Sequence, residues 1–151
     1  MVGETFSQIY RAEPEAVLCA RASLTEFART AGAGPERLDA IRLAVSEAVT
    51  NAVLHAYEKG QPGMIGLSAT YVSGELWLFV SDDGAGLRAR RSGRGLGLGL
   101  AVIAQLSDDF QIISRAGGGT ELRMLFKLTA PRRSAAAQPR RGSFASASAP
   151  A

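Results

Sequence analysis

The stretch from residue 80 to residue 100 has two aspartates near its start and is rich in glycine. Most of its six glycines fall into two clusters, residues 84–86 and 95–99, and Asp82 lies just before the first. Glycine lets the backbone approach a ligand closely, and a carboxylate can accept the exocyclic amine of adenine, directly or through an ordered water. We therefore expect Asp82, with Gly84 and Gly86 beside it, to contact a base. Taken alone, an Asp-Asp-Gly sequence is more typical of a plain turn.

The second cluster, residues 95–100, alternates glycine with leucine and precedes an apolar helical pattern. Its spacing matches neither the P-loop nor the dinucleotide-binding fingerprint. A flexible loop is the alternative, but Leu96, Leu98 and Leu100 would then have nowhere to pack. A helix start of this kind presents free N–H groups to an anion, so we expect it to hold phosphates. Of the basic residues between the clusters, Arg94 is the best candidate for a phosphate contact; the others, which a solvated loop would equally explain, are Arg88, Arg90 and Arg91.

A polar stripe runs along the longest predicted helix, residues 35–57, which is otherwise mostly apolar. Its members, spaced to lie on one helix face, are Glu47, Asn51, His55 and Glu58. A solvated face is the plain explanation, but a polar stripe on a buried helix lines a cleft or a partner. The Asn51 amide oxygen could bind Mg²⁺, which takes few protein ligands. Glu47 could orient or deprotonate a nucleophile that attacks a γ-phosphate, whereas the single histidine is more typical of a structural residue.

Thr120 follows three consecutive glycines at the start of a predicted strand. A β-branched residue is common in strands, so Thr120 could be there for packing alone. Its hydroxyl could also join Asp82 around the base, and we include it in the predicted site.

Composition indicates one globular domain with a basic tail. Of the 17 Lys and Arg residues, four lie in residues 131–151, which leaves 13 basic against 14 acidic residues in the rest of the chain. A nucleic-acid-binding surface on the domain is therefore not supported. The single cysteine, Cys19, excludes an internal disulfide, and we expect it in the core. We find neither a membrane-spanning run nor a signal peptide, and we expect a cytoplasmic protein.

The predicted elements alternate so as to give an α+β sandwich. We expect strands at residues 4–11, 64–72, 75–81, 109–115 and 120–128, and helices at 15–30, 35–57 and 98–106. The successive hairpins predict a mixed, mostly antiparallel sheet with helices on one face. We place the domain at residues 1–130 and expect the Ala-, Ser- and Pro-rich residues 131–151 to be disordered.

Taken together, these motifs resemble the GHKL (histidine-kinase-like) ATPase superfamily. The helix carrying Glu47 and Asn51 is similar to its N box, residues 82–86 to its DxGxG box, residues 95–100 to its GxGxGL box and residues 119–120 to its late Gly-Thr pair. Four motifs in this order are jointly specific. The resemblance covers residues 38–128 and is strongest to the stand-alone anti-sigma-factor serine kinases of bacteria.

The resemblance implies a Bergerat-type ATP-binding fold, ATP and Mg²⁺ as ligands, Glu47 as catalytic base, Asn51 as metal ligand and Asp82 as adenine ligand. The remaining predicted nucleotide contacts are Gly84, Gly86, Arg94, Gly95, Leu96, Gly97, Leu98, Gly99, Leu100 and Thr120. It further implies transfer of phosphate to a serine of an antagonist protein, capture of a sigma factor, and often a homodimer. Two alternatives stay open, namely a nucleotide-dependent binding module without phosphotransfer and a detached histidine-kinase catalytic domain.

Overall fold

The computed structural model describes residues 3–55, 63–84 and 98–128. In chain order its elements are β1 (Glu4–Arg11), α1 (Pro14–Thr30), α2 (Pro35–His55), β2 (Met64–Val72), β3 (Glu75–Asp82), α4 (Leu98–Leu106), β4 (Asp109–Ser114) and β5 (Thr120–Lys127). The expected order of elements is confirmed, and the boundaries that lie within the described residues agree to within one residue. Asp82 closes β3 as its last strand residue, one position later than expected.

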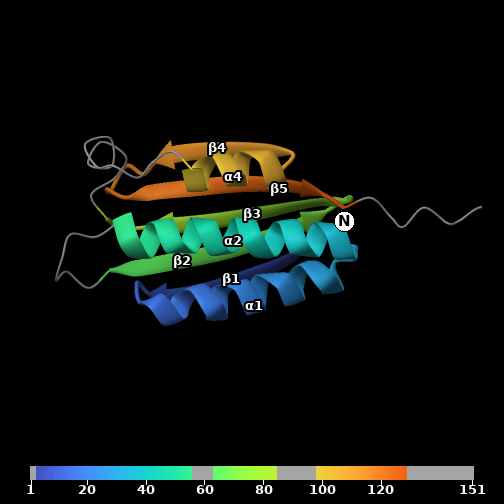
Figure 1. The fold of residues 1–151 in the computed structure, drawn as a ribbon, viewed down its shortest axis with the longest axis horizontal. Coiled ribbons are helices and arrows are strands. Elements are labelled where there is room, and N and C mark those ends of the chain that lie inside the picture. Colours follow the sequence, from blue (N-terminus) through green and yellow to red (C-terminus); the bar gives the residue numbers. More distant parts are fainter. Residues whose placement is uncertain (1–2, 56–62, 85–97, 129–151) are drawn as a thin grey trace, which may run out of the picture.

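The strands form one five-stranded sheet in the order β1-β2-β3-β5-β4. Every neighbouring pair in it is antiparallel, so the expected α+β sandwich is confirmed and the sheet is wholly antiparallel rather than mixed. The helices of the described residues, α1, α2 and α4, lie together on one face of the sheet (Figure 1). Because β3 and β5 run in opposite directions, the C-terminal end of β3 meets the N-terminal end of β5 at one end of the sheet.

The core lies between the sheet and the helices, and α2 is its central helix. The strands contribute alternate residues to this core, as β3 shows with its buried Leu76, Leu78 and Val80. The buried residues of α2 recur with helical spacing and include Ile41 and Val45. Burial of such apolar side chains stabilises a fold by about 1.5–3 kcal/mol each before the loss of entropy is counted, so this face fixes the position of α2 on the sheet.

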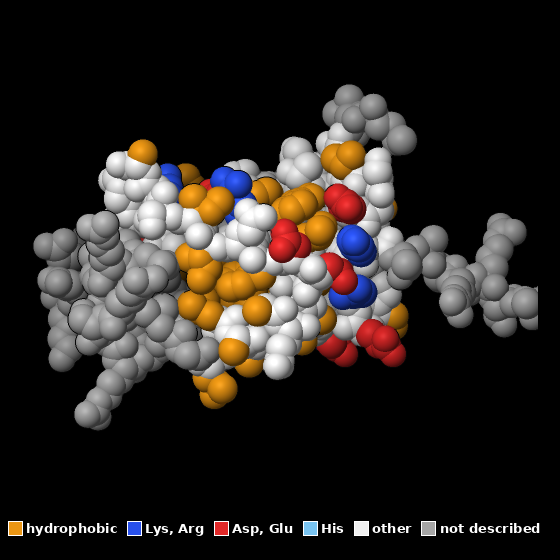
Figure 2. Space-filling view, turned by 90° about the horizontal axis from the view of Figure 1, so that it is seen from above, with side chains coloured by type: hydrophobic (Ala, Val, Ile, Leu, Met, Phe, Trp, Pro, Cys, Tyr) orange, Lys and Arg blue, Asp and Glu red, His pale blue; other side chains and the backbone are white. Residues whose placement is uncertain are grey.

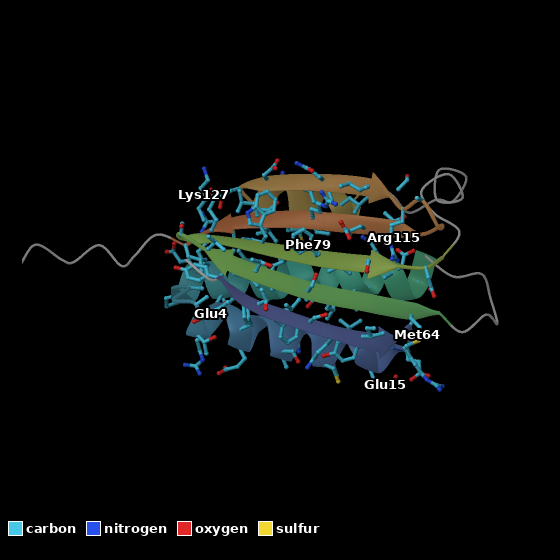
Figure 3. The ribbon with its side chains drawn as sticks, turned by 180° about the vertical axis from the view of Figure 1, so that it is seen from behind. Glu4, Glu15, Met64, Phe79, Arg115 and Lys127 are labelled. Carbon is cyan, nitrogen blue, oxygen red and sulfur yellow. The ribbon has the colours of Figure 1, made fainter. Side chains whose placement is uncertain are left out.

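The opposite face of the sheet carries no helix within the described residues (Figure 3). Trp77 and Phe79 of β3 stack there at 6.5 Å between ring centroids, and the Arg123 guanidinium lies 6.0 Å from the centre of the Phe79 ring. Leu125 of β5 pairs with Trp77 and is buried. This open sheet face is therefore partly apolar at its centre.

Two expectations about packing are wrong. Cys19 is exposed on α1 rather than in the core, because the buried face of that helix consists of Ala16, Ala20, Leu24 and Ala28. Leu98, expected to pack, is 82% exposed at the first residue of α4, where a side chain has no preceding turn to lie on. Figure 2 shows hydrophobic side chains gathered on the side of the molecule that α4 and β4 form.

The short connection between α4 and β4 is fastened to two distant elements. The Asp108 carboxylate accepts hydrogen bonds from the backbone N–H of Lys127, at 2.7 Å, and from the Arg37 guanidinium, at 3.1 Å. These contacts tie the segment after α4 to the end of β5 and to the first turn of α2.

Among the described residues, no helix is long and apolar enough to cross a membrane.

Candidate functional site

Asp82 lies at the end of β3 as a buried carboxylate with backbone partners. It is 4% exposed, and its Oδ1 accepts the backbone N–H of Gly84 at 3.1 Å and that of Thr120 at 3.3 Å. The first contact is a local turn of the kind that Asp forms two residues ahead, and the second joins β3 to β5. These two contacts hold the carboxylate in one orientation at the end of the sheet.

Thr120 approaches Asp82 differently from the expectation. Its backbone N–H, rather than its hydroxyl, is the group that binds the carboxylate. The side chain is fully buried, and its Oγ1 has no hydrogen-bond partner. A buried hydroxyl without a partner is costly, so Oγ1 is available to a bound molecule or an ordered water.

Gly119 allows the β4–β5 hairpin to press against the main chain of Asp82. A Cβ at this position would lie 1.9 Å from the carbonyl oxygen of Asp82 and 3.0 Å from the Cα of Asp83. The residue also has φ +89, a left-handed conformation that residues with a side chain rarely adopt. Glycine is therefore required at position 119 both by space and by conformation.

The N box and the start of α4 are in contact. A Cβ on Gly99 would lie 2.9 Å from Glu47 Oε2 and 3.4 Å from Asn51 Nδ2, so the first turn of α4 lies close against the ends of these two side chains. The N-terminal end of a helix carries a partial positive charge and free N–H groups, which suits the Glu47 carboxylate. Asn51 Nδ2 is buried and without a partner.

The two halves of the site lie at one end of the molecule. The C-terminal ends of α2 and β3 and the N-terminal ends of α4 and β5 all lie toward the left of Figure 1. The structure thus brings Glu47 and Asn51 together with Gly99, and Asp82 together with Gly84 and Thr120. Leu100, half-buried, packs against the hydrophobic core, whereas Leu98 does not. The predicted contacts Gly86, Arg94, Gly95, Leu96 and Gly97 lie outside the described residues, as do Glu58 and the side chain of His55.

Two residues of this region were not predicted from the sequence. Arg115 donates a hydrogen bond from Nη1 to the backbone carbonyl of Asp82 at 3.1 Å. Asp83 accepts the N–H of Met64 at 3.1 Å and so links the turn to β2. The second aspartate of the Asp-Asp-Gly sequence was a visible signal for Asp83, whereas a single arginine at the end of a strand gives no comparable signal.

The donor set fits a nucleotide with Mg²⁺ better than a metal held by the protein alone. The described residues contain no group of three or more His, Cys, Asp or Glu side chains that could hold a metal. Mg²⁺ commonly takes one or two protein oxygens and completes its shell with phosphate oxygens and water. Three buried side-chain atoms of the described residues have no hydrogen-bond partner, namely Thr25 Oγ1, Asn51 Nδ2 and Thr120 Oγ1. The last two lie in this region and are polar groups of the kind that a bound nucleotide or its waters would satisfy.

Comparison with known proteins agrees with this geometry. A family profile described as "Histidine kinase-like ATPase domain" matches residues 10–126. The chain belongs to this family. The resemblance inferred from the four motifs is therefore confirmed, and ATP is the nucleotide that the family name indicates.

Relatives of this ATPase family member carry more specific names. It is 31% identical over 116 residues to a protein named anti-sigma F factor from Clostridium acetobutylicum, a match that covers 70% of this chain and 80% of the relative. It is 34% identical over 116 residues to the serine-protein kinase RsbW of Listeria monocytogenes, covering 67% and 74% of the two chains.

A solved structure shows the same fold. A crystal structure of the RsbU and RsbW domains of a Mycobacterium tuberculosis protein superposes with a TM-score of 0.66 at 26% identity. The match covers 85% of this chain but 33% of the other, so this ATPase domain corresponds to a part of that larger protein.

Proposed function

We propose that this chain is an ATP-dependent protein-serine kinase that acts as an anti-sigma factor. The observation that carries the proposal is the contact between Gly99 at the start of α4 and the Glu47 and Asn51 side chains of α2. This contact places a helix start that can bind phosphate beside a carboxylate that can accept a proton. The names of the relatives, serine-protein kinase and anti-sigma F factor, support the choice of acceptor and partner.

Each residue then has a distinct role. Asp82 accepts the exocyclic amine of adenine, with Thr120 Oγ1 completing the contacts around the base. Residues 95–100 bind the phosphates at the start of α4, together with Arg94. The Asn51 amide oxygen is a ligand of Mg²⁺, which neutralises charge on the phosphates when it is bound.

Glu47 acts on the nucleophile. Its carboxylate accepts the proton of a serine hydroxyl, whose oxygen forms a bond to the γ-phosphorus while the bond from that phosphorus to ADP breaks. The serine belongs to a small antagonist protein, and the same domain binds a sigma factor. Positioning and charge stabilisation supply most of the acceleration in phosphoryl transfer.

Transfer of label from ATP tests the kinase. Incubation with radiolabelled ATP, Mg²⁺ and the antagonist encoded in the same organism should label one serine of the antagonist, identified by mass spectrometry. Nucleotide binding without transfer over a range of Mg²⁺ concentrations would instead favour a binding module. Capture of a sigma factor by the ATP-loaded protein, and its release by the unphosphorylated antagonist, tests the second role.

A homodimer is part of the proposal. The open sheet face, with Trp77, Phe79 and Leu125 at its centre, offers apolar surface that a second copy could cover. Light scattering on the full chain at several concentrations should give twice the mass of one chain. A monomer mass with ATP present and absent would refute the dimer without touching the kinase proposal.

Asp82→Asn should weaken ATP binding about 10- to 100-fold, the range expected for loss of a hydrogen bond to a charged group. The amide can still accept the N–H groups of Gly84 and Thr120 through its oxygen, but its NH₂ then faces the amine of adenine. Calorimetric titration with a non-hydrolysable ATP analogue measures the change. Asp83→Asn, on the adjacent exposed residue, serves as the control and should bind as the wild type does. Equal affinity in both variants would remove Asp82 from the adenine site.

A further inference from the structure

The carbonyl group of Asp82 has a partner that the roles above do not use. Arg115 and Asp82 are 33 residues apart in the chain, and the Arg115 guanidinium donates to that carbonyl at 3.1 Å. The side chain of Asp82 is the predicted base contact, so Arg115 acts on the main chain of the residue whose carboxylate must stay in place.

The hydrogen-bonded ladder between β3 and β5 ends one residue before this contact. Its last paired residues are Ser81 and Glu121, and the next N–H along β5, that of Thr120, goes to the carboxylate of Asp82. The carbonyl of Asp82 takes the guanidinium instead. Through these two side-chain contacts, β3 and the β4–β5 hairpin stay connected one residue beyond the last pair of the ladder.

The hairpin from β4 to β5 holds Arg115 in position. Its N–H donates to the carbonyl of Gly119, and its own carbonyl accepts the N–H of Gly118, both at 3.1 Å. Gly119 lies directly against the carbonyl of Asp82. One hairpin therefore contacts Asp82 at three points: through Gly119, through Thr120 and through Arg115. Figure 3 shows Arg115 at the same end of the sheet as Met64, where β2 begins.

We propose that Arg115 is a positioning residue that sets the preference for adenine by fixing the main chain of Asp82. A guanidinium is suited to this because its planar, always charged head keeps its direction. If the carbonyl is released, the carboxylate loses its fixed direction, and the hydrogen bond to the amine of adenine weakens. Guanine presents an acceptor where adenine presents that amine, so a loosened carboxylate discriminates less between the two. The proposal rests on the proposed adenine site.

The test compares ATP with GTP. For Arg115→Gln we expect ATP affinity to fall about tenfold, while the weak affinity for GTP changes little. The ratio of ATP affinity to GTP affinity should therefore also fall about tenfold. Arg115→Lys keeps the charge and one donor and should give an intermediate ratio. The control is Arg123→Gln, since Arg123 lies on the open sheet face and pairs with Glu121. Competition against a fluorescent ATP analogue on the full chain gives both affinities.

The ratio separates positioning from a merely structural role. A structural defect lowers both affinities together and leaves the ratio at the wild-type value, which would overturn the proposal. The proposal is also overturned if Arg115→Gln folds and both variants, Arg115→Gln and Arg115→Lys, keep the wild-type ratio of ATP to GTP affinity. If Arg115→Gln fails to fold, the ratio in Arg115→Lys decides. Failure of the wild-type protein to prefer ATP at all would instead refute the proposed adenine site, a result visible before any variant is made.

Discussion

Glu47→Gln should reduce phosphoryl transfer about 100- to 10,000-fold, the contribution typical of a positioned general base. Affinity for ATP should stay close to that of the wild type. The variant keeps the size of the side chain and its contact with the first turn of α4, where a Cβ on Gly99 would lie 2.9 Å from Glu47 Oε2. It removes the negative charge of the carboxylate and, with it, the ability to take a proton. Single-turnover transfer to the antagonist, measured beside equilibrium ATP binding, separates the two quantities.

Glu36→Gln is the matched control for this prediction. Glu36 lies in the first turn of the same helix, is exposed, and is remote in sequence from the polar stripe. It should leave both transfer and binding unchanged. If Glu47→Gln and Asp82→Asn instead lose binding and transfer to the same extent, the division of roles between the two carboxylates is wrong. A Glu47 variant with full transfer would exclude Glu47 as the base.

Elements with strong local signals were predicted almost to the residue. The long apolar periodicity of α2, its proline start and the glycine-flanked hairpins fix local structure by themselves. The family followed from four short motifs, because each places glycine or a polar side chain at a spacing that the fold requires. The sheet's order and wholly antiparallel pairing depend on contacts far apart in sequence, so the expectation of a mixed sheet was wrong.

Side-chain burial was harder to predict than element type. Cys19 and Leu98 are apolar residues that the structure leaves exposed, because periodicity gives a face of a helix but not how far a neighbour covers it. Arg115 could not be predicted either, since its acceptor is a main-chain carbonyl 33 residues away. A contact of this kind depends on the hairpin geometry and leaves no pattern of residue types. The backbone contact of Thr120 with Asp82 was not predicted from the sequence, whereas the contact of the Thr120 hydroxyl with a base stays a prediction.

Gly119→Ala should destabilise the fold by about 2–5 kcal/mol, as the sum of left-handed strain and overpacking, and should abolish measurable ATP binding. The added methyl would lie 1.9 Å from the carbonyl oxygen of Asp82 and 2.8 Å from its carbonyl carbon. Main-chain atoms cannot move aside as the end of a flexible side chain can, so the turn that carries Asp82 must shift. Urea unfolding and titration with the ATP analogue measure the two effects.

The three glycines of this hairpin form a graded series that isolates the cause. At Gly117 a Cβ has no atom within 4 Å, so Gly117→Ala should change stability by less than about 0.5 kcal/mol. Gly118 has φ +94, and a Cβ there would lie 3.8 Å from the carbonyl oxygen of Gly84, so its alanine variant adds strain without overlap and should be intermediate. If all three variants were equally stable and bound ATP equally, the close approach of the hairpin to Asp82 would have no part in forming the site. A loss in Gly119→Ala no larger than in Gly118→Ala would assign the effect to backbone conformation alone.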